Sequence, residues 1–411
     1  MQLTLCIQVR VIPTVALGIL SFVFAHAQSR LISGKVFDGR SKSPLQFASV
    51  SVLGKSIGTV TNANGEFDFH IPETYHHDSL LISHVGYKSF RDKIDVLPRG
   101  DLSIGLQAMP VLLREITIHE KNLTGKEIVA KAVNNLNLNY STKPFCLEGF
   151  FRAIEAENGK YTILTEAAVD IYDKNFDGKP KRQLQESVYV KEMRRSLSQG
   201  NRRRSNIGIT LADLLENNDV RYNRGMLDTA NTFSLDTVTF YKDRPVYGVS
   251  MGRGTDTGML YIDMETFGFL KIDMERRSRD DAQYYYVEDR LNKSESRRRI
   301  WFRFSVEFGQ YNEKLYPRRM HESELNEFID NTAQLKVSSV ETLELIVTNI
   351  IPGKENPAAK KMKYGLVLKE GEYHAEFWKT YNVLKLTPLD EKLIRDLERE
   401  ISLQKQFEKQ K

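Results

Sequence analysis

The stretch Phe47-Ala48-Ser49-Val50-Ser51-Val52-Leu53 alternates strictly between two sets of side chains and decides the architecture of the N-terminal region. A period of two residues is typical of a β-strand with one buried face. Similar short segments flank it between Leu31 and about Ile118, separated by turn-forming residues such as Asn62–Gly65. No helical periodicity interrupts them. The pattern therefore predicts a small antiparallel β-sandwich over residues 28–118.

Four motifs in this region also follow one another in a recognisable order: Ser33–Asp38, Pro44–Val50, Gly58–Phe67 and Ile82–Tyr87. Together they closely resemble the carboxypeptidase-regulatory-like domain of Bacteroidetes envelope proteins. The resemblance implies a transthyretin-like sandwich, which also occurs at the N-terminus of TonB-dependent receptors. That domain is an accessory domain without catalytic residues, so the resemblance implies no peptidase activity.

Two positions depart from the pattern of this domain. Asn62 stands where the family usually has Asp, and His84 stands where an aromatic residue is common. A turn tolerates the first change and a strand tolerates the second. Neither departure alters the predicted fold.

Residues 119–387 form a second region, in which one helix is followed by many strands. Thr124 and Glu127 form a capping box, and an apolar stripe continues from it to about residue 138. Strands are expected at 145–156, 161–172, 233–241, 246–251, 258–264, 267–276, 299–310, 316–328 and 335–349, with a short helix near 210–215. So many similar strands should form a curved antiparallel sheet with one or two packed helices, and we expect a helix to fill its concave face.

The second region is similar to an uncharacterised region that often follows the sandwich in Bacteroidetes proteins. The likeness rests on Asn139-Tyr140, Gly149–Arg152, Gly258–Asp263 and Phe377–Asn382. A weaker likeness connects the strand meander to half-barrels that carry lipoproteins and acyl chains across the periplasm. Neither likeness supplies catalytic residues.

The C-terminal residues 388–411 predict a helix that begins at Pro388 and carries an apolar stripe from Leu389 to Ile401. Packing on the sheet is the first interpretation. A partner-binding helix or a short coiled coil is the alternative.

The N-terminus has the layout of a secretory signal peptide over residues 1–27. Arg10 precedes an apolar run, and Ala25-His26-Ala27 provides a cleavage site before Gln28. An uncleaved membrane anchor is the alternative. We therefore expect an exported protein in the periplasm or at the periplasmic face of the outer membrane. After cleavage only Cys146 remains, so no intramolecular disulfide is expected and a buried thiol is predicted.

Three sequence matches to catalytic motifs lack the context that their chemistry needs. Ser250 lies in a G-x-S-x-G match, but another strand follows it instead of a helix. His70–Glu73 and His321–Glu324 match H-x-x-E, without a third zinc ligand at a suitable spacing. We therefore predict no catalytic residues, no metal site and no cofactor.

The chain carries 59 basic and 54 acidic residues, and a net charge of +5 is too small to predict nucleic-acid binding. Basic clusters occur at 194–195, 202–204, 276–277 and 297–299, and solvated strand edges and loops are the expected positions. The exception is Arg202, Arg203 and Arg204, which could contact anionic lipid or a partner. The sequence thus predicts a non-enzymatic binding or scaffolding module with an envelope protein or outer-membrane component as partner. The alternative is a carrier of lipid or another apolar ligand in the second domain, and the third is a hydrolase or peptidase accessory protein.

Overall fold

A computed structural model describes most of the 411-residue chain. It describes residues 29–98, 100–109, 123–174, 176–197, 207–222, 224–278, 285–286, 295–330, 335–361, 373–385, 388–399 and 401–409. The predicted signal peptide, its cleavage site between Ala27 and Gln28, and the cluster Arg202–Arg204 lie outside these residues.

The N-terminal region folds as a sandwich of two small sheets. The first sheet has the order β4-β1-β7 and the second has the order β3-β2-β5-β6. The strands are β1 (Ser29–Asp38), β2 (Ser49–Val52), β3 (Gly58–Val60), β4 (Glu66–Pro72), β5 (Ser79–Ser83), β6 (Phe90–Lys93) and β7 (Leu102–Leu106), with the short 3-10 helices η1 (Glu73–Tyr75) and η2 (Ile94–Val96). Val36, Phe67, Phe69 and Ile82 are fully buried between the two sheets.

One strand pair differs from the predicted antiparallel sandwich, because β1 and β7 are parallel. After β6 the chain crosses from the second sheet to the first and enters beside β1 in the same direction. A parallel pair needs such a crossover connection, and a tight hairpin cannot supply it. The sandwich itself, and the mainly β class of the whole chain, are confirmed.

The second region is built around a 12-stranded sheet. Its main path runs β11-β12-β13-β14-β16-β17-β18-β8-β9-β10-β19, and β15 pairs with β16. The strands are β8 (Phe145–Glu157), β9 (Lys160–Asp173), β10 (Ser187–Leu197), β11 (Thr232–Tyr241), β12 (Arg244–Arg253), β13 (Asp256–Asp263), β14 (Phe269–Arg277), β15 (Tyr285–Tyr286), β16 (Glu295–Tyr311), β17 (Lys314–Asp330), β18 (Leu335–Pro352) and β19 (Lys360–Lys361). The predicted meander is confirmed, and β10 is a strand that the pattern did not predict.

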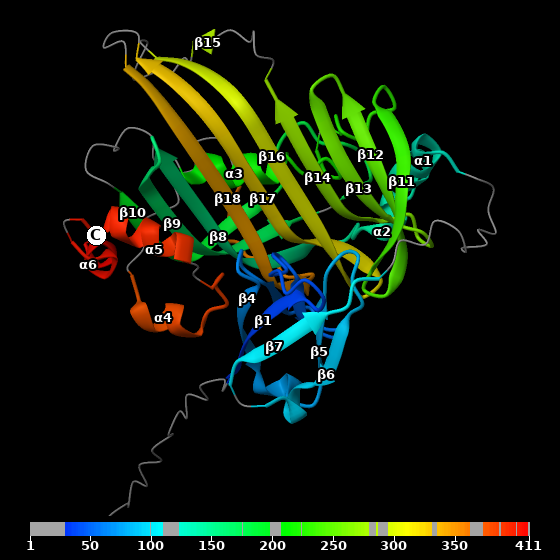
Figure 1. Cartoon of the computed structure of the whole chain (residues 1–411), viewed down its shortest axis with the longest axis horizontal. Helices are drawn as coiled ribbons and strands as arrows, with labels where there is room; N and C mark the ends of the chain where they lie inside the picture. The colour runs from blue at the N-terminus through cyan, green and yellow to red at the C-terminus, as the bar shows by residue number, and fades with distance from the viewer. Residues whose placement is uncertain are drawn as a thin grey trace, which may run out of the picture.

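Three helices cover one face of this sheet, here called the inner face. They are α1 (Gly125–Asn134), α2 (Leu136–Asn139) and α3 (Ile207–Glu216). The predicted capping box at Thr124 and Glu127 is present at the start of α1. Ile128 and Ala132 of α1 and Leu211 of α3 belong to one buried cluster with Phe151 and Leu345 of the sheet. In Figure 1 the long strands β16, β17 and β18 pass in front of α3.

The opposite face of the sheet, here called the outer face, carries the C-terminal segments. They are α4 (Ala375–Thr380), α5 (Pro388–Leu397) and α6 (Leu403–Glu408). Leu393, Leu397 and Phe407 pack with Leu164 of β9. The predicted single helix over 388–411 is therefore wrong, because Ser402 caps a separate helix after α5 ends. The tail also does not fill the inner face, which α1, α2 and α3 occupy.

The N-terminal sandwich docks on the outer face near the turns of the large sheet (Figure 1). The ring of Phe47 lies 3.5 Å from the guanidinium carbon of Arg319 on β17. Asn382 clamps the other side, since its amide oxygen accepts from the His70 backbone N–H at 2.7 Å and its amide nitrogen donates to the His70 carbonyl at 3.2 Å. Val60 and Trp378 share a further apolar cluster. These contacts hold the sandwich, the sheet and the C-terminal segment together.

Candidate functional site

Side chains of the described helices and strands pack closely on the inner face of the large sheet. A cavity of about 50 Å³ remains there, lined mainly by Tyr140, Phe145, Phe176, Leu215 and Met320. Pockets that bury drug-sized ligands measure about 300–1,000 Å³. The expected filling of this face by a helix is confirmed for α1 and α2, and α3 contributes as well.

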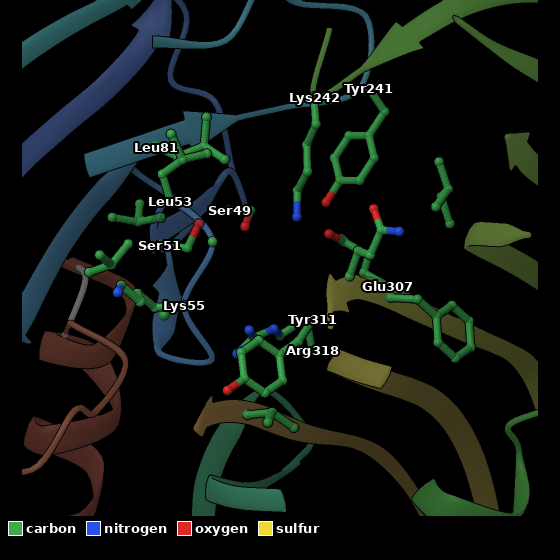
Figure 2. Close-up of a pocket in the computed structure, with 18 of the residues that line it drawn as sticks. Ser49, Ser51, Leu53, Lys55, Leu81, Tyr241, Lys242, Glu307, Tyr311 and Arg318 are labelled. Carbon is green, nitrogen blue, oxygen red and sulfur yellow. The ribbon is translucent and has the colours of Figure 1, made fainter. Parts of the chain in front are cut away.

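A much larger pocket of about 430 Å³ lies between the N-terminal sandwich and the large sheet. The sandwich contributes β2, β3 and the loop between them, and the sheet contributes the β11–β12 hairpin, the β16–β17 hairpin and part of β18. Figure 2 shows side chains from both domains around this space, among them Ser49, Leu81, Tyr241, Lys242 and Arg318. We call it the interdomain pocket.

The turn between β11 and β12 places Lys242 in the interdomain pocket. Tyr241 pairs with Arg244, so Lys242 and Asp243 form a two-residue turn, with φ angles of 52° and 61°. Such a turn favours Asn-Gly, and left-handed backbone costs other residues about 1 kcal/mol or more. Asp243 offsets this strain by accepting from the Ser89 backbone N–H at 2.8 Å and from Arg91 at 2.7 Å. Docking onto the sandwich thus holds the turn in place.

Burial shifts the proton affinities of the groups in the interdomain pocket. Burial and the nearby charge of Arg318 lower the pKa of Lys242 to about 8. Burial lowers the pKa of Arg318 to about 10. Burial and the charge of Glu307 raise the pKa of the Tyr241 hydroxyl. Desolvation penalises the charged form of each group and is the first cause of all three shifts.

Most charged side chains of this pocket have partners of opposite charge. The pairs are Lys55 with Asp78 at 3.5 Å, Arg91 with Asp243 at 2.7 Å, Arg244 with Asp263 at 2.8 Å, and Arg319 with Glu344 at 2.8 Å and Glu307 at 3.6 Å. Lys242, Arg318 and the exposed Glu313 differ, because none of them forms an ion pair within the described residues. Arg318 instead donates from Nη1 to the Ser56 carbonyl at 2.5 Å. The pocket thus holds two cations that form no ion pair within the described residues, although the charge of Glu307 favours the charged form of Lys242.

A cluster of carboxyl groups lies on the inner face beyond the apolar core. Glu324 is bound by Arg297 at 2.5 Å and by Arg299 at 2.9 Å. Burial and the charge of Glu324 raise the pKa of Glu322 to about 8, and the same two causes raise that of Glu341 to about 8. Asn217 donates to Glu322 at 2.7 Å. Both glutamates therefore keep their protons to a higher pH than an exposed glutamate does.

The H-x-x-E matches do not form ligand pairs. His321 and Glu324 lie three residues apart on β17, so they project from opposite faces of the sheet. His321 is near Phe47 of the sandwich, with 6.0 Å between ring centroids, whereas Glu324 pairs with arginines on the inner face. The backbone of His70 is occupied by Asn382. The described part of the chain holds no group of three or more side chains placed to bind a metal ion.

Ser250 lies inside β12, where it pairs with Ser234 and Met259 of the neighbouring strands. The strand predicted for this residue is confirmed, and the sharp turn of a nucleophile elbow is not formed there. Cys146 is fully buried, as predicted, and burial raises the pKa of its thiol to about 12.

The prediction that the basic clusters are solvated is wrong for several arginines. Arg194 pairs with Glu166 at 2.5 Å and lies 4.4 Å from the Trp378 ring, and Arg195 is only 7% exposed. Arg297 pairs with Glu324 on the inner face. A carboxylate or an aromatic ring on a neighbouring element offsets the desolvation of these charges. Arg277 fits the prediction, because its side chain is exposed and pairs with Glu275.

A comparison with known protein families finds a match for the N-terminal sandwich. Residues 32–118 match the family model of the CarboxypepD_reg-like domain. The resemblance noted from the four motifs is thereby confirmed for this domain. The match does not extend into the large sheet. A comparison with curated proteins found no match.

Three solved structures show partial likeness to the chain. A DUF1329 family protein from Desulfovibrio piger is 11% identical and covers 56% of this chain and 93% of its own, with a TM-score of 0.26. A putative outer membrane lipoprotein-sorting protein domain from Vibrio parahaemolyticus is 9% identical, and the match covers 57% of this chain and 94% of that domain, with a TM-score of 0.24. Lipovitellin, in a structure concerned with lipid–protein interactions, is 9% identical, and the match covers 55% of this chain and 27% of lipovitellin, with a TM-score of 0.25. These scores are too low to carry an argument about fold or function.

The described helices are all too short or too polar to cross a bilayer. The interdomain pocket was not predicted from the sequence. Its one local signal is the pair Lys242-Asp243 between two alternating strands, which indicates a hairpin but not the surface onto which that hairpin docks.

Proposed function

We propose that this protein is an exported, non-enzymatic binding module that acts at the periplasmic side of the outer membrane and holds a ligand in the interdomain pocket. One observation carries the proposal: the described residues of the inner face line a cavity of about 50 Å³, whereas a pocket of about 430 Å³ lies between the two domains. The larger volume lies within the range of small-molecule sites. The A-x-A site before Gln28 supports export.

Carriage of an acyl chain on the inner face receives less support. Ile128 and Ala132 of α1 and Leu211 of α3 are all completely buried against the sheet. Removing these helices to admit a lipid would expose their apolar stripes to water, at about 25 cal/mol per Å² of apolar surface. We therefore place the ligand outside this core.

The clamp around Asn382 and Trp378 supports a scaffolding role for the same module. It fixes the relative position of both domains, so a partner that binds one domain meets the other in a set orientation. Envelope proteins and outer-membrane components are the partners that the proposed location would bring within reach.

The test is capture from the native envelope, followed by mass spectrometry of both proteins and lipids. We expect a small ligand to copurify with the wild-type chain and to be lost when Ser51→Trp fills the interdomain pocket. Co-purification of one lipid per chain without detergent, displaced by a bulky substitution at Met320 and not by Ser51→Trp, would contradict the proposal and favour the lipid carrier.

The non-enzymatic assignment has its own test. Ser250→Ala and His321→Ala should leave any envelope phenotype unchanged, because neither side chain lies in a catalytic arrangement. Circular dichroism confirms that each variant is folded. Loss of the phenotype in either folded variant, or stoichiometric zinc in the purified protein, would overturn it.

A further inference from the structure

We infer that the interdomain pocket binds a small molecule through an oxyanion group, a phosphate or a carboxylate, held between Lys242 and Arg318. This inference rests on the proposed role of the pocket as the ligand site and adds the chemical class of the ligand. It starts from Lys242 and Arg318, which form no ion pair within the described residues.

The charges of the pocket favour an anion. Lys242 and Arg318 come from two different hairpins and approach the same space, as Figure 2 shows. Both side chains are partly buried, and the charge of Arg318 disfavours that of Lys242. Two like charges held together away from water are unfavourable unless an opposite charge accompanies them. An oxyanion between them would supply that charge.

One acidic side chain of the pocket acts on Lys242. Glu307 faces the pocket from β16, but its carboxylate lies 3.6 Å from Arg319, which is itself only 2% exposed. The charge of Glu307 also favours the charged form of Lys242, but one carboxylate shared with Arg319 does not balance both Lys242 and Arg318.

Neutral hydrogen-bonding groups surround the same space. Figure 2 shows the hydroxyls of Ser49 and Tyr241 on the side of the pocket near Lys242. Because burial raises the pKa of Tyr241, its phenol keeps its proton and can donate to an oxyanion. Charge-assisted hydrogen bonds of this kind are about twice as strong as neutral ones.

Part of the remaining wall is apolar, and the rest is polar and includes Lys55, Arg244 and Glu313. Leu53 and Leu81 come from the sandwich, and Leu270 and Ile346 come from the sheet. A volume of about 430 Å³ suits a small metabolite and not a folded partner. The expected ligand thus combines one acidic group with a modest apolar part.

The experiment uses the full mature chain and two probes, inorganic phosphate and acetate. Isothermal titration at constant ionic strength, with sodium chloride as the blank, measures each dissociation constant. We expect saturable binding of at least one probe. We further expect Lys242→Gln and Arg318→Gln each to weaken it at least tenfold, and Lys88→Gln, an exposed lysine outside the pocket, to leave it unchanged. Lys242 lies on a turn and is partly exposed, so Lys242→Gln should fold even if Arg318→Gln does not.

Equal affinity in Lys242→Gln and wild type, or no saturable binding of either probe, would overturn the inference. Native mass spectrometry of protein purified from the envelope separates this result from failure of the proposed function. A ligand without an acidic group, lost in Ser51→Trp, would refute the oxyanion but retain the pocket. Identical ligand and partner capture by wild type and Ser51→Trp would refute the pocket itself.

Discussion

Replacing Glu322 by Gln should stabilise the protein at alkaline pH and leave its stability nearly unchanged near pH 5. Glu322 is 6% exposed on the inner face, and burial together with the charge of Glu324 raises its pKa from 4.5 to about 8. The folded state thus keeps this proton up to about pH 8, whereas the unfolded chain releases it near 4.5. Unfolding releases a proton within this window, so the stability contributed by Glu322 falls as pH rises from about 4.5 to 8.

The magnitude follows from the size of this shift. At about 1.4 kcal/mol per pKa unit, a rise from 4.5 to about 8 corresponds to an upper limit of roughly 5 kcal/mol. Glu324 and Asp213 share this interaction and respond when the charge at position 322 is removed. We therefore expect Glu322→Gln to be about 2–3 kcal/mol more stable than wild type at pH 8.5. The Gln carbonyl can still accept the 2.7 Å hydrogen bond from Asn217.

Urea unfolding, followed by tryptophan fluorescence at several pH values from about 5 to 9, measures the difference between variant and wild type. This difference isolates position 322 from all other titrating groups. Glu327→Gln serves as the matched control, because Glu327 lies on the same strand and pairs with Arg298 at 2.9 Å and with Lys336 at 2.7 Å. A difference that does not grow between pH 5 and 8.5, or a less stable Glu322→Gln at pH 8.5, would refute the reasoning.

Three further outcomes are expected. Asn382→Ala should remove both hydrogen bonds to the His70 backbone and weaken domain docking by about 1–2 kcal/mol. Hydrogen exchange at the His70 amide should then be faster, and unchanged exchange would contradict the role of Asn382 in docking. Cys146 should resist iodoacetamide at pH 8 in the native protein and react in urea, because it is fully buried with a pKa of about 12; native labelling would place it near the surface. N-terminal sequencing of the mature protein should begin at Gln28, whereas a chain that begins at Met1 in the membrane fraction would indicate an anchor.

Local patterns predicted much of the fold. The alternation in Phe47–Leu53 predicted a strand, and the structure has β2 within it. The capping box at Thr124 and the stripe at Ile128 and Ala132 predicted both a helix and its burial. These features depend on neighbours a few residues away in sequence, where periodicity and capping chemistry decide the outcome.

The features that were missed depend on contacts between distant segments. β10 contains the charged residues Lys191, Glu192, Arg194 and Arg195, and this composition alone predicts a solvated segment. The structure shows instead that Arg194 pairs with Glu166 on the neighbouring strand β9. Glu322 alternates with Ser323 like a residue of a solvated strand face, yet that face turns toward α3. The interdomain pocket forms only where the β11–β12 hairpin contacts the sandwich, and no local sequence pattern predicts this contact.

The pairing of β18 with β8 has a consequence for how the chain acquires its structure. Phe145 pairs with Pro352, and Glu157 pairs with Ser339, so this contact joins segments about two hundred residues apart. Loop closure over such a distance slows folding, and proteins rich in such contacts fold in milliseconds to seconds or longer. During synthesis the β8 edge stays without its final neighbour until β18 emerges. The nascent chain should therefore depend on a holding chaperone during this interval, because an unpaired strand edge promotes aggregation.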